Sequence, residues 1–409
     1  MGTTPRGPRL SSGKAQEHVR RHNLGTLLGH LHLAGPLSRA ELTSLMGLNR
    51  STIAALVSEL VALGAVSEER PAGARSGVGR PSLVVRPAPG PQVLVADIGV
   101  DRIALARVGL GGRVMARKEA ALPEPAPSAP DLADRLAAVA ATIPADPGAG
   151  ERVVGFGVSI PGAIRRADGL VRFAPNLGWV DEPFGNLLSR RVPGLPVRVA
   201  NDADLGLLGE HRRGVARGFD DVVFIAGEVG VGGGLIVDGR PLVGAGGYAG
   251  EVGHMRVRPK GRRCRCGGHG CWETEIGAEA IRGALNLPEA SSAELARVLR
   301  ESAGRVPGDL DRVARYLGLG LANIINVVNP KLVIVGGLLR EVLAQMPDTV
   351  RDGMAAATLT APGEQALLRV PELGGDAILF GAAELALQDL LDDPAGVLGA
   401  VERVPDTGR

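Results

Sequence analysis

Aromatic residues are scarce in this sequence, which has two Trp, two Tyr and six Phe among 409 residues. Apolar cores must therefore be built from Leu, Val, Ile and Ala, and a hydrophobic content of 45% is ample for two or three packed domains. Long apolar stretches are missing too: no run reaches 18 residues, and the opening MGTTPRGPRLSSGK has no apolar segment of signal-peptide length. These absences argue against a membrane partner, and we expect a cytoplasmic protein.

Lysine is equally scarce, because only four of the 46 basic residues are lysine and the rest are arginine. The net charge of +2 is unevenly distributed along the chain. Residues 1–90 hold 11 Lys or Arg against 5 Asp or Glu, a balance of +6, whereas residues 91–409 hold 35 against 39, a balance of −4. A basic N-terminal part on a mildly acidic remainder predicts an anionic partner for the N-terminal part.

All three cysteines of the chain lie in one stretch, GEVGHMRVRPKGRRCRCGGHGCWE, residues 250–273. An odd number of clustered cysteines favours metal binding in a reducing compartment over disulfides. Cys264, Cys266 and Cys271, with His254 ten residues before the first of them, make a complete tetrahedral ligand set for a structural Zn²⁺. The alternative interpretation is three buried free cysteines and an unrelated histidine.

Two glutamates flank this predicted zinc site. Glu251 lies three residues before His254, and Glu273 lies two residues after Cys271. A metal that fixes both ends of the segment would hold the two carboxylates near each other, where they could accept hydrogen bonds from the hydroxyls of a polyhydroxylated ligand. The alternative is that both are solvated surface charges.

The N-terminal part has the pattern of three helices, over residues 16–34, 38–46 and 50–63, after a flexible basic tail at 1–15. A tight turn at 47–49 joins the second and third, as in a helix-turn-helix. Polar residues at the start of the third helix suit phosphates and base edges in a major groove. The predicted DNA contacts in this region are Arg39, Asn49, Arg50, Ser51 and Thr52. A three-helix bundle used for protein contact is the alternative.

A β-hairpin is predicted after these helices. Its strands are residues 66–69 and 82–85, and its tip, RPAGARSGVGRP, is rich in Gly and Arg. This pattern is typical of a winged helix over residues 16–86, in which Arg75 and Arg80 would enter a minor groove. The alternative is a disordered linker. Residues 87–92 read as a stiff Pro-rich linker to the rest of the chain.

The remainder of the chain contains two similar blocks, residues 93–118 and 222–243, each reading as strand, Gly turn, strand. Helix and strand signals follow each block, so we expect an α/β protein with an internal duplication of the actin and sugar-kinase type. Lobe 1 would span 93–200, completed by a C-terminal helix at 377–395, and lobe 2 would span 201–376 with the zinc site. Ligands of such folds lie in the cleft between the lobes.

Several motifs resemble the ROK family, a group of sugar kinases and sugar-responsive repressors. They are CRCGGHGCWE, the PNLGW at 175–179, the NDADLGLLGE at 201–210 and, near the N-terminus, VRRHN, SRAEL and GRP. The resemblance implies a winged helix-turn-helix followed by a two-lobed actin-like/sugar-kinase (ribonuclease H-like) ATPase fold. It also implies that Asp202 matches the general base of the kinase members. The sugar-binding positions it implies are Asn176, Asn201, Asp202, Glu251, His254 and Glu273.

The phosphate-binding turns depart from the pattern of the family's kinases. Asp101 stands where they carry a hydroxyl residue, and Glu228 stands where they usually carry threonine. Two unit charges about 4 Å apart repel by roughly 4 kcal/mol at an effective dielectric near 20, so carboxylates here should oppose ATP binding. We therefore expect a sugar-responsive regulator that binds operator DNA and a sugar or sugar phosphate, as a homodimer or homotetramer. An active ATP-dependent hexose kinase, and a scaffold whose N-terminal part only dimerises, are the alternatives.

Three groups of single residues have plainer interpretations. Trp179 and Trp272 are expected in the core, although they lie in sugar-adjacent motifs. The histidines at 18, 22, 30 and 32 have no cysteine nearby, so a solvated or packed helix face is expected rather than a metal site. Asp204 and Glu210 are expected on a helix surface or in structural pairs.

Overall fold

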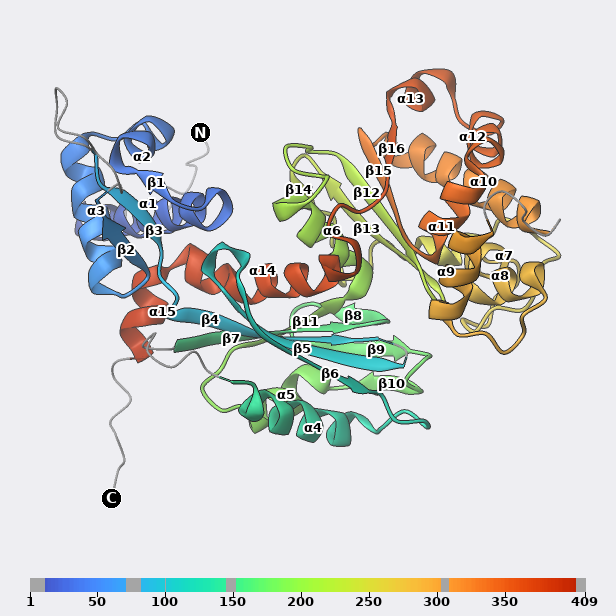
Figure 1. Cartoon of the computed structure of the whole chain (residues 1–409), viewed down its shortest axis with the longest axis horizontal. Helices are drawn as coiled ribbons and strands as arrows, with labels where there is room; N and C mark the ends of the chain where they lie inside the picture. Colours follow the sequence, from blue (N-terminus) through green and yellow to red (C-terminus); the bar gives the residue numbers. More distant parts are fainter. Residues whose placement is uncertain (1–11, 71–81, 100, 145–151, 303–308, 402–409) are drawn as a thin grey trace, which may run out of the picture.

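A computed structural model of the chain describes residues 12–70, 82–99, 101–144, 152–302 and 309–401 (Figure 1). The N-terminal head, at the left of the figure, combines three helices with a small antiparallel sheet of order β1-β3-β2. Its elements are α1 (Ser12–Ala34), β1 (Leu37–Ser38), α2 (Arg39–Met46), α3 (Arg50–Ala62), β2 (Val66–Glu69) and β3 (Val84–Pro87). The predicted winged helix-turn-helix is therefore present. Arg75 and Arg80, which were predicted to contact a minor groove, lie outside the described residues.

Local sequence signals set the turn between α2 and α3. Ser38 and Glu41 form a capping box, with Glu41 N–H donating to Ser38 Oγ at 3.2 Å and Ser38 N–H donating to Glu41 Oε2 at 2.7 Å. Gly47 ends α2 with φ 63°, a left-handed conformation that glycine adopts without strain. Asn49 then caps α3 by accepting from Thr52 N–H at 2.8 Å.

Some predicted boundaries were wrong. The first helix begins at Ser12 rather than at residue 16, and the strand expected at 82–85 lies two residues further along, at Val84–Pro87. The linker expected over 87–92 shrinks to residues 88–90, because the next strand already begins at Pro91. Proline is tolerated at the first position of a strand, so a Pro-rich sequence did not keep this segment out of the sheets.

Lobe 1 is built on a five-stranded sheet of order β11-β7-β4-β5-β6, in which β4 pairs antiparallel with β5 and parallel with β7. A second, three-stranded sheet of order β10-β9-β8 extends it. The strands are β4 (Pro91–Ile98), β5 (Arg102–Gly109), β6 (Val114–Ala121), β7 (Arg152–Ile160), β8 (Ala163–Arg165), β9 (Leu170–Ala174), β10 (Trp179–Glu182) and β11 (Val197–Asn201). The helical segments are η1 (Leu110–Gly112), α4 (Ala129–Thr142) and α5 (Phe184–Arg191).

Lobe 2 repeats the same strand pattern with β14-β13-β12-β15-β16, where β12 pairs antiparallel with β13 and parallel with β15. The predicted internal duplication is thus confirmed. The strands are β12 (Val222–Gly227), β13 (Val231–Val237), β14 (Arg240–Pro241), β15 (Leu332–Gly337) and β16 (Leu367–Arg369). The helical segments are α6 (Asp202–Arg213), η2 (Val252–His254), α7 (Trp272–Ile276), α8 (Ala278–Leu285), α9 (Ser292–Glu301), α10 (Leu310–Val328), α11 (Leu338–Gln345), α12 (Pro347–Ala355), α13 (Thr360–Gln365) and η3 (Gly374–Asp376).

Two C-terminal helices, α14 (Ala377–Asp392) and α15 (Pro394–Val401), return to the first half of the chain. Figure 1 shows α14 lying along the sheet of lobe 1, between that sheet and the head. Glycines in β7 allow the close approach, because a Cβ on Gly157 would lie 2.1 Å from the carbonyl oxygen of Ala382. A single buried apolar cluster consequently runs from Leu24 and Leu31 of α1 to Leu387 of α14 and Leu398 of α15.

Both tryptophans are core residues, as predicted. Trp179 is 4% exposed and donates its Nε1–H to the carbonyl oxygen of Pro127 at 3.1 Å. Trp272 is fully buried and donates to the carbonyl oxygen of Tyr316 at 2.7 Å, which joins α7 to α10. Within the described residues, none of the helices combines the length and the apolar character that crossing a bilayer requires.

Candidate functional site

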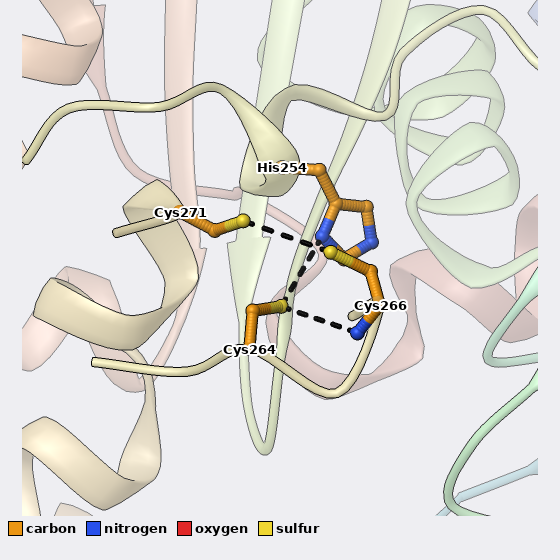
Figure 2. A group of neighbouring side chains, drawn as sticks. All are labelled: His254, Cys264, Cys266 and Cys271. Atoms are coloured by element: carbon orange, nitrogen blue, oxygen red, sulfur yellow. Dashed lines mark hydrogen bonds between the residues drawn. The ribbon is translucent and has the colours of Figure 1, made fainter. Parts of the chain in front are cut away.

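The predicted metal ligands lie together in lobe 2 (Figure 2). One ligand atom from each of His254, Cys264, Cys266 and Cys271 lies within 4.8 Å of every other. Cys266 Sγ is 3.7 Å from Cys271 Sγ, and Cys264 Sγ is 3.7 Å from His254 Nδ1. Zn–S bonds of about 2.3 Å in a tetrahedron place neighbouring sulfurs roughly 3.8 Å apart. The four side chains are therefore close enough to share one tetrahedral metal ion.

Glycines give the loop the shape that brings these ligands together. Gly267 and Gly270 have φ of 90° and 67°, which residues with a side chain rarely adopt. At Gly270 a Cβ would also lie 1.6 Å from the carbonyl oxygen of Arg258. The turn is closed by a hydrogen bond of 2.8 Å, which Cys264 N–H donates to the carbonyl oxygen of Gly268. Only glycine fits at position 270, so the loop depends on it.

The two nitrogens of His254 face different groups. Nδ1 points at the cysteine cluster, whereas Nε2 lies 3.8 Å from Glu251 Oε2. Glu273 lies on the other side, with Oε1 3.7 Å from His254 Nδ1 and 2.8 Å from Cys264 Sγ. Desolvation raises the pKa of Glu251, and the nearby charge of Glu273 adds to the rise. The two carboxylates that the sequence predicted to meet thus flank one imidazole.

The first residues of α6 form the neighbouring part of the site. Asn201 caps this helix by accepting from Ala203 N–H at 2.8 Å, and its Nδ2 donates to the carbonyl oxygen of Gly162 at 2.9 Å. Asp202 is the first residue of the helix, and its Oδ1 accepts from Ala203 N–H at 2.9 Å. Because Asn201 holds lobe 1 at Gly162 and starts α6, the predicted base sits at a fixed junction between the two lobes.

Asp202 lies in an acidic environment. Its pKa is raised to about 7, first by desolvation and then by the charge of Glu228, with smaller effects from Asp97 and Asp204. Desolvation and the charge of Asp97 also raise the pKa of Glu228, while Arg102 opposes the rise. Several carboxyl groups thus crowd around the start of α6.

Asn176 reaches the site from the other lobe. It lies between β9 and β10, and its Oδ1 accepts from Arg265 NH1 at 2.9 Å. Arg265 stands between two cysteines of the metal loop, so this bond ties lobe 1 to the metal loop. A ligand between the lobes would have to fit beside it or replace it.

A small cavity is lined by residues of this site, and its lining includes a side chain to which the sequence analysis gave no role in ligand binding. Asp204, expected on a helix surface or in a structural pair, lines this cavity with Asn201 and Glu251. Desolvation raises its pKa to about 6, and the guanidinium of Arg166 opposes the rise. The spacing could have shown this, because the N-cap residue and the third helical residue of a helix lie on the same side. Glu210 is a structural residue, fully buried and bonded to three backbone N–H groups of other segments.

The residues predicted to contact DNA differ in whether their side chains already have hydrogen-bond partners within the head. Arg39 donates Nη2–H to Glu68 at 2.7 Å, which ties α2 to β2, so its guanidinium is already paired. The amide oxygen of Asn49 also accepts from Ser51 Oγ at 2.7 Å, so both side chains take part in capping α3. Arg50 is exposed at the first position of that helix, and Thr52 is partly exposed. Arg50 is therefore the unpaired guanidinium that α3 presents among the described residues.

Comparison with known proteins covers nearly the whole chain. The xylose repressor of Bacillus subtilis (strain 168) is 28% identical over 381 residues, which are 92% of this chain and 98% of that repressor. A glucokinase of Streptomyces coelicolor (strain ATCC BAA-471 / A3(2) / M145) is 31% identical over 313 residues, which are 71% of this chain and 96% of the kinase.

Solved structures agree with these sequence matches. The crystal structure of a ROK family transcriptional regulator, a homolog of the E. coli MLC protein, aligns with a TM-score of 0.75 at 26% identity and covers 94% of this chain and 98% of that one. A ROK family glucokinase from Streptomyces griseus, in complex with glucose and AMPPNP, aligns with a TM-score of 0.61 at 32% identity and covers 73% of this chain and 99% of the kinase. The sequence model of the ROK family matches residues 93–389, so this chain belongs to the ROK family.

Proposed function

We propose that this protein is a sugar-responsive transcriptional regulator that represses genes of carbohydrate metabolism. The observation that carries the proposal is the extent of the matches. The xylose repressor aligns over 92% of the chain, winged-helix head included, whereas the glucokinase aligns over 71%. The part that a kinase lacks is the part built to hold DNA.

The ligand we propose is a sugar or a sugar phosphate bound between the lobes. Glu251, His254 and Glu273 offer two carboxylates and an imidazole nitrogen within a few ångströms of one another. Ionised carboxylates accept strong hydrogen bonds from hydroxyl groups, which suits a polyhydroxylated ligand. Asn201 and Asp202 at the start of α6, and Asn176 from lobe 1, would complete the set.

The metal we propose is a structural Zn²⁺ held by His254, Cys264, Cys266 and Cys271. Three thiolates and an imidazole suit zinc, and a ligand set that is already complete leaves no open position for catalysis. The ion would fix the loop that carries Glu273 and would hold His254 so that Nε2 faces Glu251. The ligand site would then depend on the metal for its shape.

ATP is not expected to be a cofactor. The charge of Asp97 raises the pKa of Glu228, and the charges of both raise the pKa of Asp202, so a triphosphate would add negative charge beside carboxyl groups that already disfavour it. One observation favours the alternative of a sugar kinase, because Asp202 matches the position of the general base in the kinase members of the family. A coupled assay of ADP release with D-glucose and D-xylose separates the readings, and turnover that Asp202→Asn abolishes would establish a kinase.

For DNA recognition we propose that α3 lies in a major groove, with Arg50, Ser51 and Thr52 at the bases and phosphates. Palindromic operators are read by symmetric oligomers, so a homodimer or homotetramer is the expected species. Ligand binding would change the orientation of the two heads and take them out of register with their half-sites.

The test uses a DNA duplex selected from a randomised library by the wild-type protein. Its affinity is measured by fluorescence anisotropy with and without saturating D-xylose or D-glucose, whose binding is followed by calorimetry. We expect Arg50→Ala to weaken DNA binding and a bound sugar to change DNA affinity. Absence of specific DNA binding, or a sugar that binds without changing DNA affinity, would refute the proposal.

A further inference from the structure

Helix α6 connects the candidate ligand site to the head. It begins at Asp202 and ends at Arg213, and at about 1.5 Å per residue its 12 residues span roughly 18 Å. In Figure 1 it lies between the two lobes, beside α14. The helix is therefore the most direct rigid element between the predicted sugar-binding residues and the part of the chain that would hold DNA.

A buried hydrogen-bond network surrounds the C-terminal end of this helix. Arg213 Nε–H donates to Glu384 Oε1 of α14 at 2.6 Å, and His32 Nε2 lies 3.0 Å from the same oxygen. The His32 side chain is fully buried, and those of Glu384 and Arg213 are 4% and 13% exposed. Three segments, one of them the first helix of the head, thus meet at one carboxylate.

His32 joins the network through both ring nitrogens. Gly111 N–H donates to Nδ1 at 3.0 Å, and Nε2 lies 3.0 Å from Glu384 Oε1 and 2.5 Å from Arg213 Nη2. Arg213 also donates Nη1–H to the carbonyl oxygen of Gly111 at 3.0 Å, so Arg213 and His32 both bond to Gly111. Every member has a partner, and a displacement of Arg213 would break bonds both to α14 and to η1. A buried network of this kind couples the groups that it joins, so the loss of one member affects the others.

Contacts between backbones make the helices move together. A Cβ on Gly209 of α6 would lie 2.1 Å from the carbonyl oxygen of Ala377, and one on Gly381 of α14 would lie 1.8 Å from that of Leu205. Near the C-terminal end of α14, a Cβ on Gly25 of α1 would lie 2.2 Å from the carbonyl oxygen of Leu391. Helix α14 is therefore held closely by α6 and by α1, and packed interfaces of this kind shift between discrete arrangements rather than deform.

We infer that α6, Glu384 and His32 form the relay by which a ligand at Asp202 changes the orientation of the head. A ligand that draws the N-terminal end of α6 toward it moves Arg213 at the other end. Arg213 pulls on Glu384 and on the η1 turn, and His32 carries the displacement into α1. Arg213, Glu384 and His32 act as positioning residues, since none of them lies at the ligand site. The inference rests on the proposed function and adds the path of the signal.

The experiment measures the ratio of the DNA dissociation constants with and without a saturating sugar, using D-xylose and D-glucose as probes and the library-selected duplex. For Arg213→Ala we expect this ratio to fall to within twofold of one. The affinity for the sugar should change less than threefold, because the ligand site is untouched. Glu384→Gln is the second variant; it removes the charge with little change of shape, and the same loss of response is expected.

Arg198→Ala is the matched control. Arg198 of β11 donates to Asp389 of α14 at 2.6 Å, so it is an arginine–carboxylate pair on the same helix that lies wholly within the body. This variant should keep the wild-type ratio, and thermal melts report whether each variant is folded. If Arg213→Ala and Glu384→Gln both keep the wild-type ratio, the relay is refuted while the proposed function stands. If the wild-type protein binds the sugar but its two DNA dissociation constants are equal, the proposed function itself is refuted.

Discussion

The raised pKa of Asp202 predicts how the stability of the protein depends on pH. In the folded chain this carboxyl titrates at about 7 instead of its ordinary 3.8. Between these two values the folded state holds a proton that the unfolded state has lost, so unfolding releases it. Stability must therefore fall as the pH rises through this window and level off above about pH 7. The substitution Asp202→Asn removes the titration and should remove its share of the slope.

The magnitude follows from the size of the shift. From roughly pH 5.5 to the pKa, at about 1.36 kcal/mol per pH unit, the proton contributes about 2 kcal/mol. Asp202 is partly exposed, which screens the interaction, so we expect about half of this, ~1 kcal/mol. For domains of this size ~1 kcal/mol corresponds to roughly 2–4 °C in Tm. The Tm of Asp202→Asn relative to wild type should therefore be about 2–4 °C higher near pH 8.5 than at about pH 5.5.

The assay is differential scanning calorimetry of both proteins at the two pH values. The control is Asp348→Asn, because the side chain of Asp348 is 91% exposed and its replacement should give the same difference in Tm at both. The reasoning would be refuted by an Asp202→Asn difference that does not change with pH. A variant that is less stable at the higher pH would refute it as well.

Three further predictions concern packing and the metal loop. Gly209→Ala places a Cβ 2.1 Å from a carbonyl oxygen and should lower the free energy of unfolding by ~1–3 kcal/mol. Gly283→Ala, on α8 with open space around it, should raise the free energy of unfolding by ~0.5–1 kcal/mol. Thermal melts in which the Tm of both variants moves in the same direction would contradict this. Cys271→Ser should lower the zinc content and the affinity for sugar together, as measured by atomic absorption and calorimetry, and a variant that keeps a full equivalent of zinc would be the contrary result. Trp272→Phe loses a 2.7 Å hydrogen bond in the core and should cost ~1–3 kcal/mol in urea unfolding, so an unchanged midpoint would be evidence against it.

The sequence predicted those features that local patterns encode. The four candidate metal ligands were predicted from residue type and spacing within 18 residues, and the structure brings them together. The capping box at Ser38 and the glycine turn after it marked the helix-turn-helix correctly, since hydrogen bonds three residues apart set them. The duplicated strand pattern predicted the two lobes correctly, because the first strands of each lobe follow one another in the sequence.

What the sequence could not predict depends on contacts between distant segments. His32 was expected only on a solvated or packed face, but it bonds to Glu384, 352 residues away, and no periodicity marks such a pair. Arg39 was predicted to contact DNA, and its pairing with Glu68 of β2 becomes visible only once α2 and β2 are placed together. Half of the expected linker belongs to strands, because Pro87 ends β3 and Pro91 begins β4.

The shared core of α1, α14 and α15 has a consequence for biosynthesis. The ribosome makes α1 first, yet the leucines of that helix pack against Leu387 and Leu398, which are added near the end of synthesis. Until then the part of the apolar face of α1 that packs on α14 and α15 has no cover, and such surfaces on nascent chains are what chaperones hold. A chain released early, by a premature stop codon before residue 377, would carry every residue of the winged helix and still leave that part of its core open.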